Sequence, residues 1–203
     1  MELTSYKTLS ERSEGIYKEK GSKFIGIVVP CFSEAEVKKY LEEWRKEHHQ
    51  ARHLCYAFRL KADGSLYRYN DDGEPSNSAG APIFGQIQSY DLTNVLIGVI
   101  RYYGGTKLGV GGLINAYRTA AQLAIQNGQI ITRNLHTFFD VHFEYSEMPY
   151  VMNAIKEQQW KIDEQVFEES CFLSMQVPLE KTSFAVELLE KIEGVTLTTK
   201  GVF

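Results

Sequence analysis

The alternation of apolar and polar residues in the last third of the chain constrains its fold most strongly. Phe139, Val141, Phe143 and Tyr145 alternate with polar side chains, which is typical of a half-buried strand. The same kind of periodicity predicts the remaining elements of this region, which are strands at 160–167, 173–177 and 195–199 and helices at 148–155 and 184–192. The resulting order, β-α-β-β-α-β, is the ferredoxin-like arrangement.

A glycine-rich segment earlier in the chain joins a predicted strand to a predicted helix. Five glycines lie within nine residues, from Gly104 to Gly112, between an apolar strand at 95–100 and a helical pattern at 113–126. Glycine permits positive φ and close approach of a ligand, and the start of a helix offers unpaired N–H groups. Because Lys107 adds a positive charge, the segment predicts a phosphate or carboxylate site. The alternative is a turn whose glycines serve packing alone.

This segment differs from the common phosphate-binding motifs. Lys107 follows Thr106 where a Walker loop has glycine. The dinucleotide motif G-x-G-x-x-G is absent, and no acidic residue lies about 20 positions further on. We therefore expect neither NAD nor Walker-type ATP binding, and no cofactor.

A set of short motifs between about residue 16 and residue 118 is more specific than any one of its members. In chain order they are Lys20-Gly-Ser-Lys-Phe-Ile25, Ala51-Arg-His53, Asp71-Asp-Gly-Glu-Pro75, Gly80-x-Pro82, Arg101-Tyr-Tyr-Gly-Gly105, Leu108-Gly109 and Gly111-Gly-Leu-x-x-Ala-Tyr117. Together they resemble the IMPACT family, in particular its bacterial YigZ-like members.

The resemblance implies both a fold and a biological context. It implies an α+β protein with two domains. The N-terminal domain, at residues 1–133, would be similar to domain 2 of ribosomal protein S5. The C-terminal domain, at 137–203, would be ferredoxin-like and similar to the last domain of elongation factor G. Eukaryotic relatives regulate translation initiation by binding a protein partner of a stress kinase, so the resemblance implies a translation-linked role.

The distribution of charge restricts where a nucleic acid can bind. Residues 1–133 contain 17 lysines and arginines against 14 acidic residues, whereas residues 134–203 contain 5 against 12. Because the second region repels a polyanion, RNA or a ribosome would bind to the first. A translation-linked protein is the alternative partner, and we expect no DNA sequence specificity.

Several features indicate a cytoplasmic protein. The most apolar run, residues 95–100, is too short to span a bilayer, and the N-terminus has no apolar region of a secretory signal. The three cysteines, Cys31, Cys55 and Cys171, are odd in number and widely spaced. They are typical of reduced thiols and form no Cys-x-x-Cys metal motif.

Candidate site residues lie in three of the motifs. Asp71, Asp72 and Glu74 place three carboxylates within four residues, which predicts either a cation site or a solvated turn, and we favour the turn. His53 suits either a general base or a structural role at the start of a strand. The full set predicted to bind, with no catalytic residue and no metal ligand assigned, is Arg52, His53, Asp71, Asp72, Glu74, Arg101, Tyr102, Tyr103, Gly104, Gly105, Lys107, Gly109, Gly111, Gly112, Tyr117 and Arg118.

Two functions are compatible with these residues. We favour a non-enzymatic protein that binds RNA, the ribosome or a translation-linked protein. The alternative is a hydrolase or transferase acting on a phosphorylated or nucleotide-containing substrate, in which Asp71, Asp72 and Glu74 hold a cation or move protons. The two differ in geometry, because an enzyme requires His53, these carboxylates and the glycine-rich segment to line one concave pocket.

Overall fold

The computed structural model describes residues 3–202, which divide into two compact units. One unit comprises residues 6–133, and the other comprises residues 134–202 together with 3–5. We call them the N-terminal and C-terminal units. Within the described residues, no helix is long and apolar enough to cross a membrane.

The N-terminal unit is built on a five-stranded sheet with the order β2-β3-β6-β4-β5. All neighbouring strands of this sheet are antiparallel. A separate two-stranded sheet pairs β1 with β7. The strands are β1 (Ser5–Leu9), β2 (Ser13–Glu19), β3 (Ser22–Pro30), β4 (His53–Leu60), β5 (Leu66–Asn70), β6 (Val95–Tyr102) and β7 (Ile130–Asn134).

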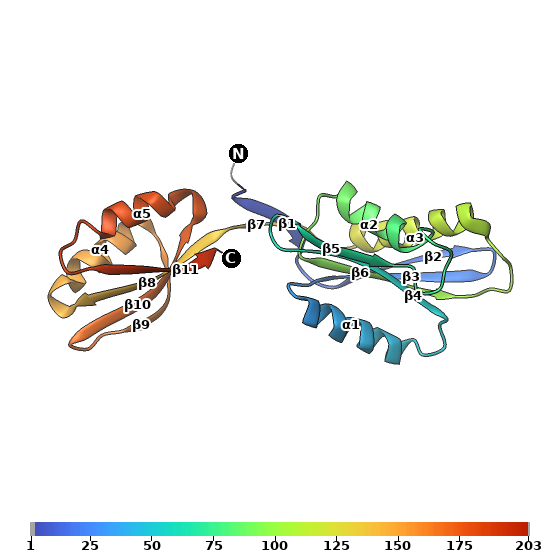
Figure 1. Ribbon diagram of the computed structural model, residues 1–203, viewed down its shortest axis with the longest axis horizontal. Coiled ribbons are helices and arrows are strands. Elements are labelled where there is room, and N and C mark those ends of the chain that lie inside the picture. The colour runs from blue at the N-terminus through green and yellow to red at the C-terminus, as the bar shows by residue number, and fades with distance from the viewer. Residues whose placement is uncertain (1–2, 203) are drawn as a thin grey trace. The chain divides into compact units, whose positions relative to one another are not determined.

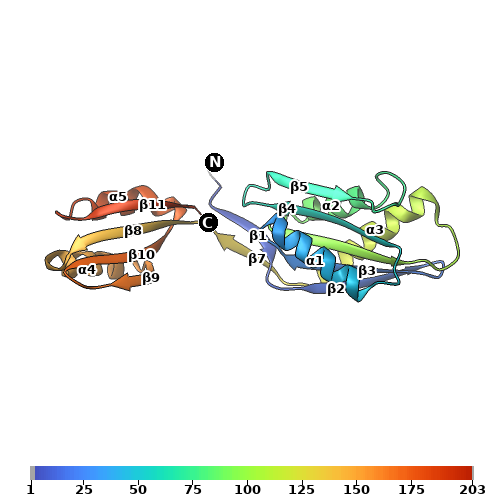
Figure 2. The same cartoon turned by 60° about the horizontal axis from the view of Figure 1, so that its bottom comes forward.

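Helices cover both faces of the five-stranded sheet (Figures 1 and 2). The helix α1 (Glu34–Glu47) lies on one face, and α2 (Gly80–Ser89) and α3 (Gly109–Gln126) lie on the other. A separate apolar core fills each interface: Trp44 of α1 packs in one core and Tyr117 of α3 in the other, and both are essentially buried. Because β3 and β6 contribute side chains to both cores, the sequences of these two strands are nearly continuous apolar runs.

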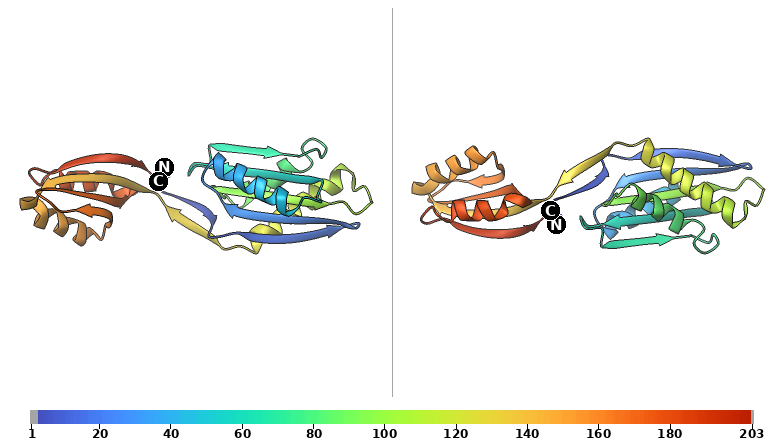
Figure 3. Two further views of the ribbon diagram at one scale, coloured as in Figure 1. Left: turned by 90° about the horizontal axis from the view of Figure 1, so that it is seen from below. Right: turned by 90° about the horizontal axis from the view of Figure 1, so that it is seen from above.

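The C-terminal unit is a four-stranded antiparallel sheet with the order β11-β8-β10-β9 and two helices on one face (Figure 3). Its elements are β8 (His136–Glu144), the 3₁₀ turn η1 (Tyr145–Glu147), α4 (Met148–Gln158), β9 (Lys161–Val166), β10 (Ser170–Pro178), the 3₁₀ turn η2 (Leu179–Lys181), α5 (Thr182–Leu189) and β11 (Thr196–Val202). This topology is ferredoxin-like, and the predicted α+β class is confirmed.

Local signals account for several element boundaries. Ser33 caps α1, because its hydroxyl accepts a hydrogen bond from Glu36 N at 3.2 Å, and Glu36 accepts one from Phe32 N. Ser146 precedes α4 but does not cap it: it lies in η1, and its hydroxyl donates to Glu147 Oε2.

The start of α3 also differs from expectation. The sequence predicted it at Leu113, whereas the helix begins four residues earlier at Gly109. Gly109, Gly111 and Gly112 therefore form its first turn instead of a loop. Glycine has low helix propensity, so the apolar pattern alone does not reveal this turn.

Candidate functional site

Three of the predicted motifs meet around one cavity of about 450 Å³ in the N-terminal unit. The start of β4, the Asp71–Pro75 loop and the glycine-rich segment each contribute to its wall. The lining residues are Arg52, His53, Glu74, Pro75, Arg101, Tyr103, Lys107, Leu108, Gly109, Val110 and Leu113. A larger groove of about 850 Å³ lies beside α1, but its lining contains none of the predicted site residues.

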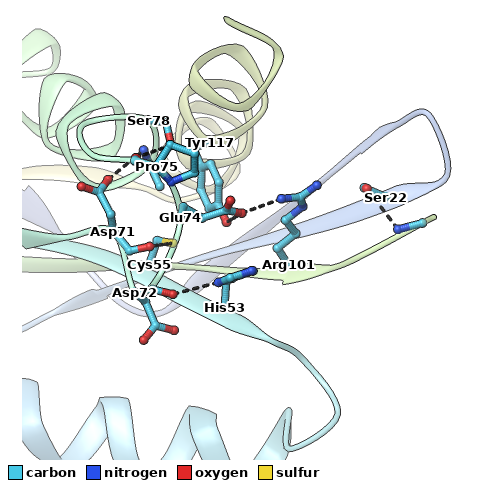
Figure 4. A network of polar contacts seen from close by, with 12 residues as sticks. Ser22, His53, Cys55, Asp71, Asp72, Glu74, Pro75, Ser78, Arg101 and Tyr117 are labelled. Atoms are coloured by element: carbon cyan, nitrogen blue, oxygen red, sulfur yellow. Dashed lines mark hydrogen bonds and ion pairs between the residues drawn. The ribbon is translucent and has the colours of Figure 1, made fainter. Parts of the chain in front are cut away.

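A buried ion pair forms part of this cavity. Arg101 Nη1 lies 2.6 Å from Glu74 Oε1, and the two side chains are 7% and 4% exposed. The Tyr117 hydroxyl donates to the same oxygen at 2.8 Å (Figure 4). The pKa of Tyr117 is raised far above its usual range, chiefly by burial and further by the thiol of Cys55 and the carboxylate of Glu74. Tyr117 therefore stays protonated and remains a donor, which ties the loop to β6 and α3.

Two aromatic rings lie close to the Arg101 guanidinium. Its central carbon lies 5.4 Å from the ring centre of Phe24 and 5.4 Å from that of Tyr103. Phe24 is fully buried, whereas Tyr103 is 44% exposed. Within the described residues, Arg101 Nε is buried and has no hydrogen-bond partner. The guanidinium is therefore held in place beside the cavity by Glu74 and by the two rings.

The three clustered carboxylates point in three directions (Figure 4). Asp71 accepts hydrogen bonds from Asn77 N, Ala79 N and Gly80 N at 2.8–3.0 Å, so it caps the start of α2. Asp72 accepts from Leu54 N and pairs with Arg45, both at 2.6 Å. Only Glu74 reaches the cavity.

Asp71 and Asp72 therefore do not join Glu74 at the cavity, although the enzyme alternative requires this; both bond backbone amides, as in the turn that the sequence favours. Asp71 and Asp72 hold backbone and neighbouring elements in place, and neither lines the cavity. Among the described residues, no group of three or more His, Cys, Asp or Glu side chains has the arrangement of a metal site.

His53 lies at the edge of the cavity with a defined tautomer. Its Nδ1 is 2.8 Å from the carbonyl oxygen of Asp72. Because a carbonyl oxygen only accepts, Nδ1 carries the proton, and in the neutral ring Nε2 is left as an acceptor. Figure 4 shows this second nitrogen on the side that faces Arg101. The nearby Cys55 thiol donates to Asp71 O, and burial raises its pKa well above the usual range, so Cys55 is not a nucleophile.

The glycine-rich segment packs against the turn between β2 and β3. Gly104 N donates to Ser22 Oγ at 3.1 Å, and a Cβ on Gly104 would collide with the backbone of Gly21. Gly105 and Gly109 have φ of +86° and +72°, as expected for glycines in this segment. Leu108, at the N-cap position of α3, makes no side-chain cap hydrogen bond within the described residues, so amides of the first turn stay available at the cavity wall.

The structure brings some of the predicted binding residues together and separates others. Those that line the cavity are Arg52, His53, Glu74, Arg101, Tyr103, Lys107 and Gly109. Tyr102 instead packs against the α1 core, and its hydroxyl bonds His48 Nδ1 at 2.9 Å, a role for His48 that the sequence did not suggest. Tyr117 is a core residue whose ring has no exposed face for stacking, and Arg118 is exposed on α3 away from the lining. The remaining predicted residues, which also lie outside the lining, are Asp71, Asp72, Gly104, Gly105, Gly111 and Gly112.

Sequence reasoning missed the apolar wall of the cavity. Leu108, Val110, Leu113 and Pro75 all belong to the lining. Val110 is 53% exposed although it lies in an otherwise amphipathic helix. The sequence signal for this wall was the pair of apolar residues, Leu108 and Val110, that lies among the glycines.

Comparisons with known proteins agree on one family. The sequence profile of the Impact N-terminal domain matches residues 20–125. The chain is 28% identical to "IMPACT family member YvyE" of Bacillus subtilis, over 94% of this chain and 88% of that protein. It is 30% identical to an "IMPACT family member" of Haemophilus influenzae, over 92% and 93%. A solved structure titled "Crystal structure of an hypothetical protein" matches with a TM-score of 0.74 and 25% identity, over 98% of this chain and 99% of the other.

Proposed function

The chain belongs to the IMPACT family, and on this premise we propose that it is a translation-associated regulatory protein of the cytoplasm that acts by binding RNA through its N-terminal domain. The cavity carries this proposal, because it gathers Arg52, Lys107 and the uncapped N-terminus of α3 at one place. Each of these groups favours a phosphate.

Charge and aromatic character support RNA over an acidic protein as the partner. Tyr103 lies beside Arg101 with 44% of its surface exposed, and an exposed aromatic ring next to cations is suited to base stacking. The acidic C-terminal region, with 12 acidic against 5 basic residues in 134–203, favours RNA contact at the N-terminal domain alone. Such contacts are made to the phosphate backbone and to the faces of the bases, which differ little between sequences, so we expect little sequence preference.

The test is the affinity for a short single-stranded RNA of mixed sequence as a function of salt. Lys107→Ala should weaken binding and reduce the salt slope by about one unit. Lys39→Ala is the matched control, since Lys39 is an exposed lysine of α1 on the opposite face of the sheet. If the purified wild-type protein binds no RNA, or if both variants weaken binding equally, the proposal fails.

A second candidate function, hydrolysis or group transfer on a phosphorylated substrate, is favoured by one observation. His53 lines the cavity with its Nδ1 bonded to Asp72 O, so in the neutral ring its Nε2 is an acceptor there. Glu74 is the one clustered carboxylate available to such a reaction, and it is neutralised by Arg101. Release of phosphate from a 5′-phosphorylated RNA that disappears in His53→Ala would establish the enzyme and displace the binding proposal.

A further inference from the structure

We propose that the cavity described above is built for a nucleoside phosphate monoester, presented as the phosphorylated end of an RNA strand. This inference rests on the proposed function, because it takes the same cavity as the point of RNA contact. It adds which chemical group enters the cavity and from which part of the strand that group comes.

The shape of the site is the first argument. A volume of about 450 Å³ lies within the range of small-ligand cavities, ~300–1,000 Å³. The wall is drawn from the start of β4, the Asp71–Pro75 loop, the end of β6 and the start of α3, so the site is a pocket between segments instead of a groove along one strand. A pocket accommodates the end of an RNA strand more readily than its middle, because at an internal phosphate the strand has to continue out of the pocket in both directions.

The donors of the site are the second argument. The first turn of α3 has no side-chain cap and no acidic residue, so nothing in that turn competes with a ligand for its amides. Arg101 also belongs to the lining, where it is 6% exposed and its Nη1 pairs with Glu74 Oε1 at 2.6 Å. Its Nε is buried, so the donors that a ligand can reach are the amides of this turn and the exposed side chains of Arg52 and Lys107.

The charge balance selects the form of the phosphate. Glu74 and Arg101 neutralise each other at 2.6 Å. The remaining charges at the cavity are Arg52 and Lys107, both on exposed side chains. A phosphate monoester carries about −1.5 to −2 at neutral pH, which matches two cations. An internal phosphodiester carries a single charge and leaves one of them unmatched.

The apolar side of the cavity suits the nucleoside part. Leu108, Val110 and Leu113 give a wall without charge next to the donors of α3. Tyr103 offers a partly exposed ring on the same cavity. A sugar against the wall and a base on the ring would keep the phosphate at the helix start.

The experiment compares ligands that differ only in the phosphate. One RNA oligonucleotide is titrated with a 5′-phosphate, with a 3′-phosphate and with hydroxyls at both ends, and adenosine monophosphate is titrated against adenosine. We expect one phosphorylated end to bind about tenfold more tightly than the hydroxyl form, because a charge-assisted contact is gained. Lys107→Ala and Arg52→Ala should each reduce this preference, whereas Lys39→Ala should retain it. Melting temperature confirms that each variant is folded.

The outcomes separate this inference from the proposed function. If all three oligonucleotides bind equally, RNA binding stands and the terminal-phosphate inference is overturned. If adenosine monophosphate binds and is weakened in Lys107→Ala while no RNA binds, a free nucleotide is the source of the monoester and the RNA function fails. If neither RNA nor adenosine monophosphate binds, both fail.

Discussion

The buried pair of Arg101 and Glu74 supports a quantitative prediction about the N-terminal unit. The side chains are 7% and 4% exposed and meet at 2.6 Å, so Arg101→Met leaves Glu74 charged and buried with Tyr117 as its remaining donor. Removal of one partner from such a pair costs about 3–5 kcal/mol of unfolding free energy. Glu74→Gln keeps the shape and an acceptor for Tyr117 but leaves the Arg101 charge buried, so it should also cost about 3–5 kcal/mol.

The double variant distinguishes this explanation from a loss of packing. With both charges removed, no uncompensated ion is buried, so the double variant should be more stable than Arg101→Met alone. The assay is urea unfolding followed by the fluorescence of Trp44, which is 1% exposed in the N-terminal unit. A Trp160→Phe background leaves Trp44 as the one tryptophan of the chain. If the cost of the double variant equals the sum of the two single costs to within about 0.5 kcal/mol, the reasoning is refuted, because independent sites add in this way.

Three further predictions concern other parts of the chain. Asp71→Ala should lower the stability of the N-terminal unit by about 1–2 kcal/mol through loss of the α2 cap, and Mg²⁺ should not raise the melting temperature of the wild type; a Mg²⁺-dependent rise would contradict this use of the carboxylate. Burial raises the pKa of Cys31 to about 11, so on raising the pH the unfolded state releases the thiol proton before the folded state does, and the free energy of unfolding should fall between about pH 9 and pH 11. Urea unfolding at alkaline pH should show a smaller fall in Cys31→Ala than in the wild type. Residues 134–203 should unfold cooperatively on their own and more stably than 137–203, because Leu135 O accepts from Leu179 N at 2.9 Å; absence of a sigmoidal urea transition in both fragments would contradict two independently folding domains.

The fold was predictable from the sequence wherever side-chain periodicity was strong. The alternation around Phe139 and Val141 predicted β8, and both are fully buried there. The burial of Tyr117 was also readable, since Leu113, Ala116 and Tyr117 share one face of a helix and are all buried. The motif instead placed Tyr117 among the residues predicted to bind.

The cavity was only partly predictable, because its geometry depends on contacts between distant segments. The motifs identified Glu74 and Arg101, but their pairing joins residues 27 positions apart. Neighbouring Asp71 and Asp72 looked equivalent in sequence, yet one caps α2 and the other contacts β4 and α1. Side chains in a turn diverge according to partners elsewhere in the chain, and a single sequence does not specify those partners.

The most direct test of the central claim is a map of backbone amide chemical shifts during titration with 5′- and 3′-phosphorylated RNA. Because the amides at the start of α3 are the groups assigned to the phosphate, those of Gly109, Val110 and Gly111 should shift with one of these ligands. They should shift less with the same RNA lacking the phosphate, and the amides of α1 should not respond to either. Shifts confined to α1 or to residues 134–202, with no change at 109–111, would contradict the account.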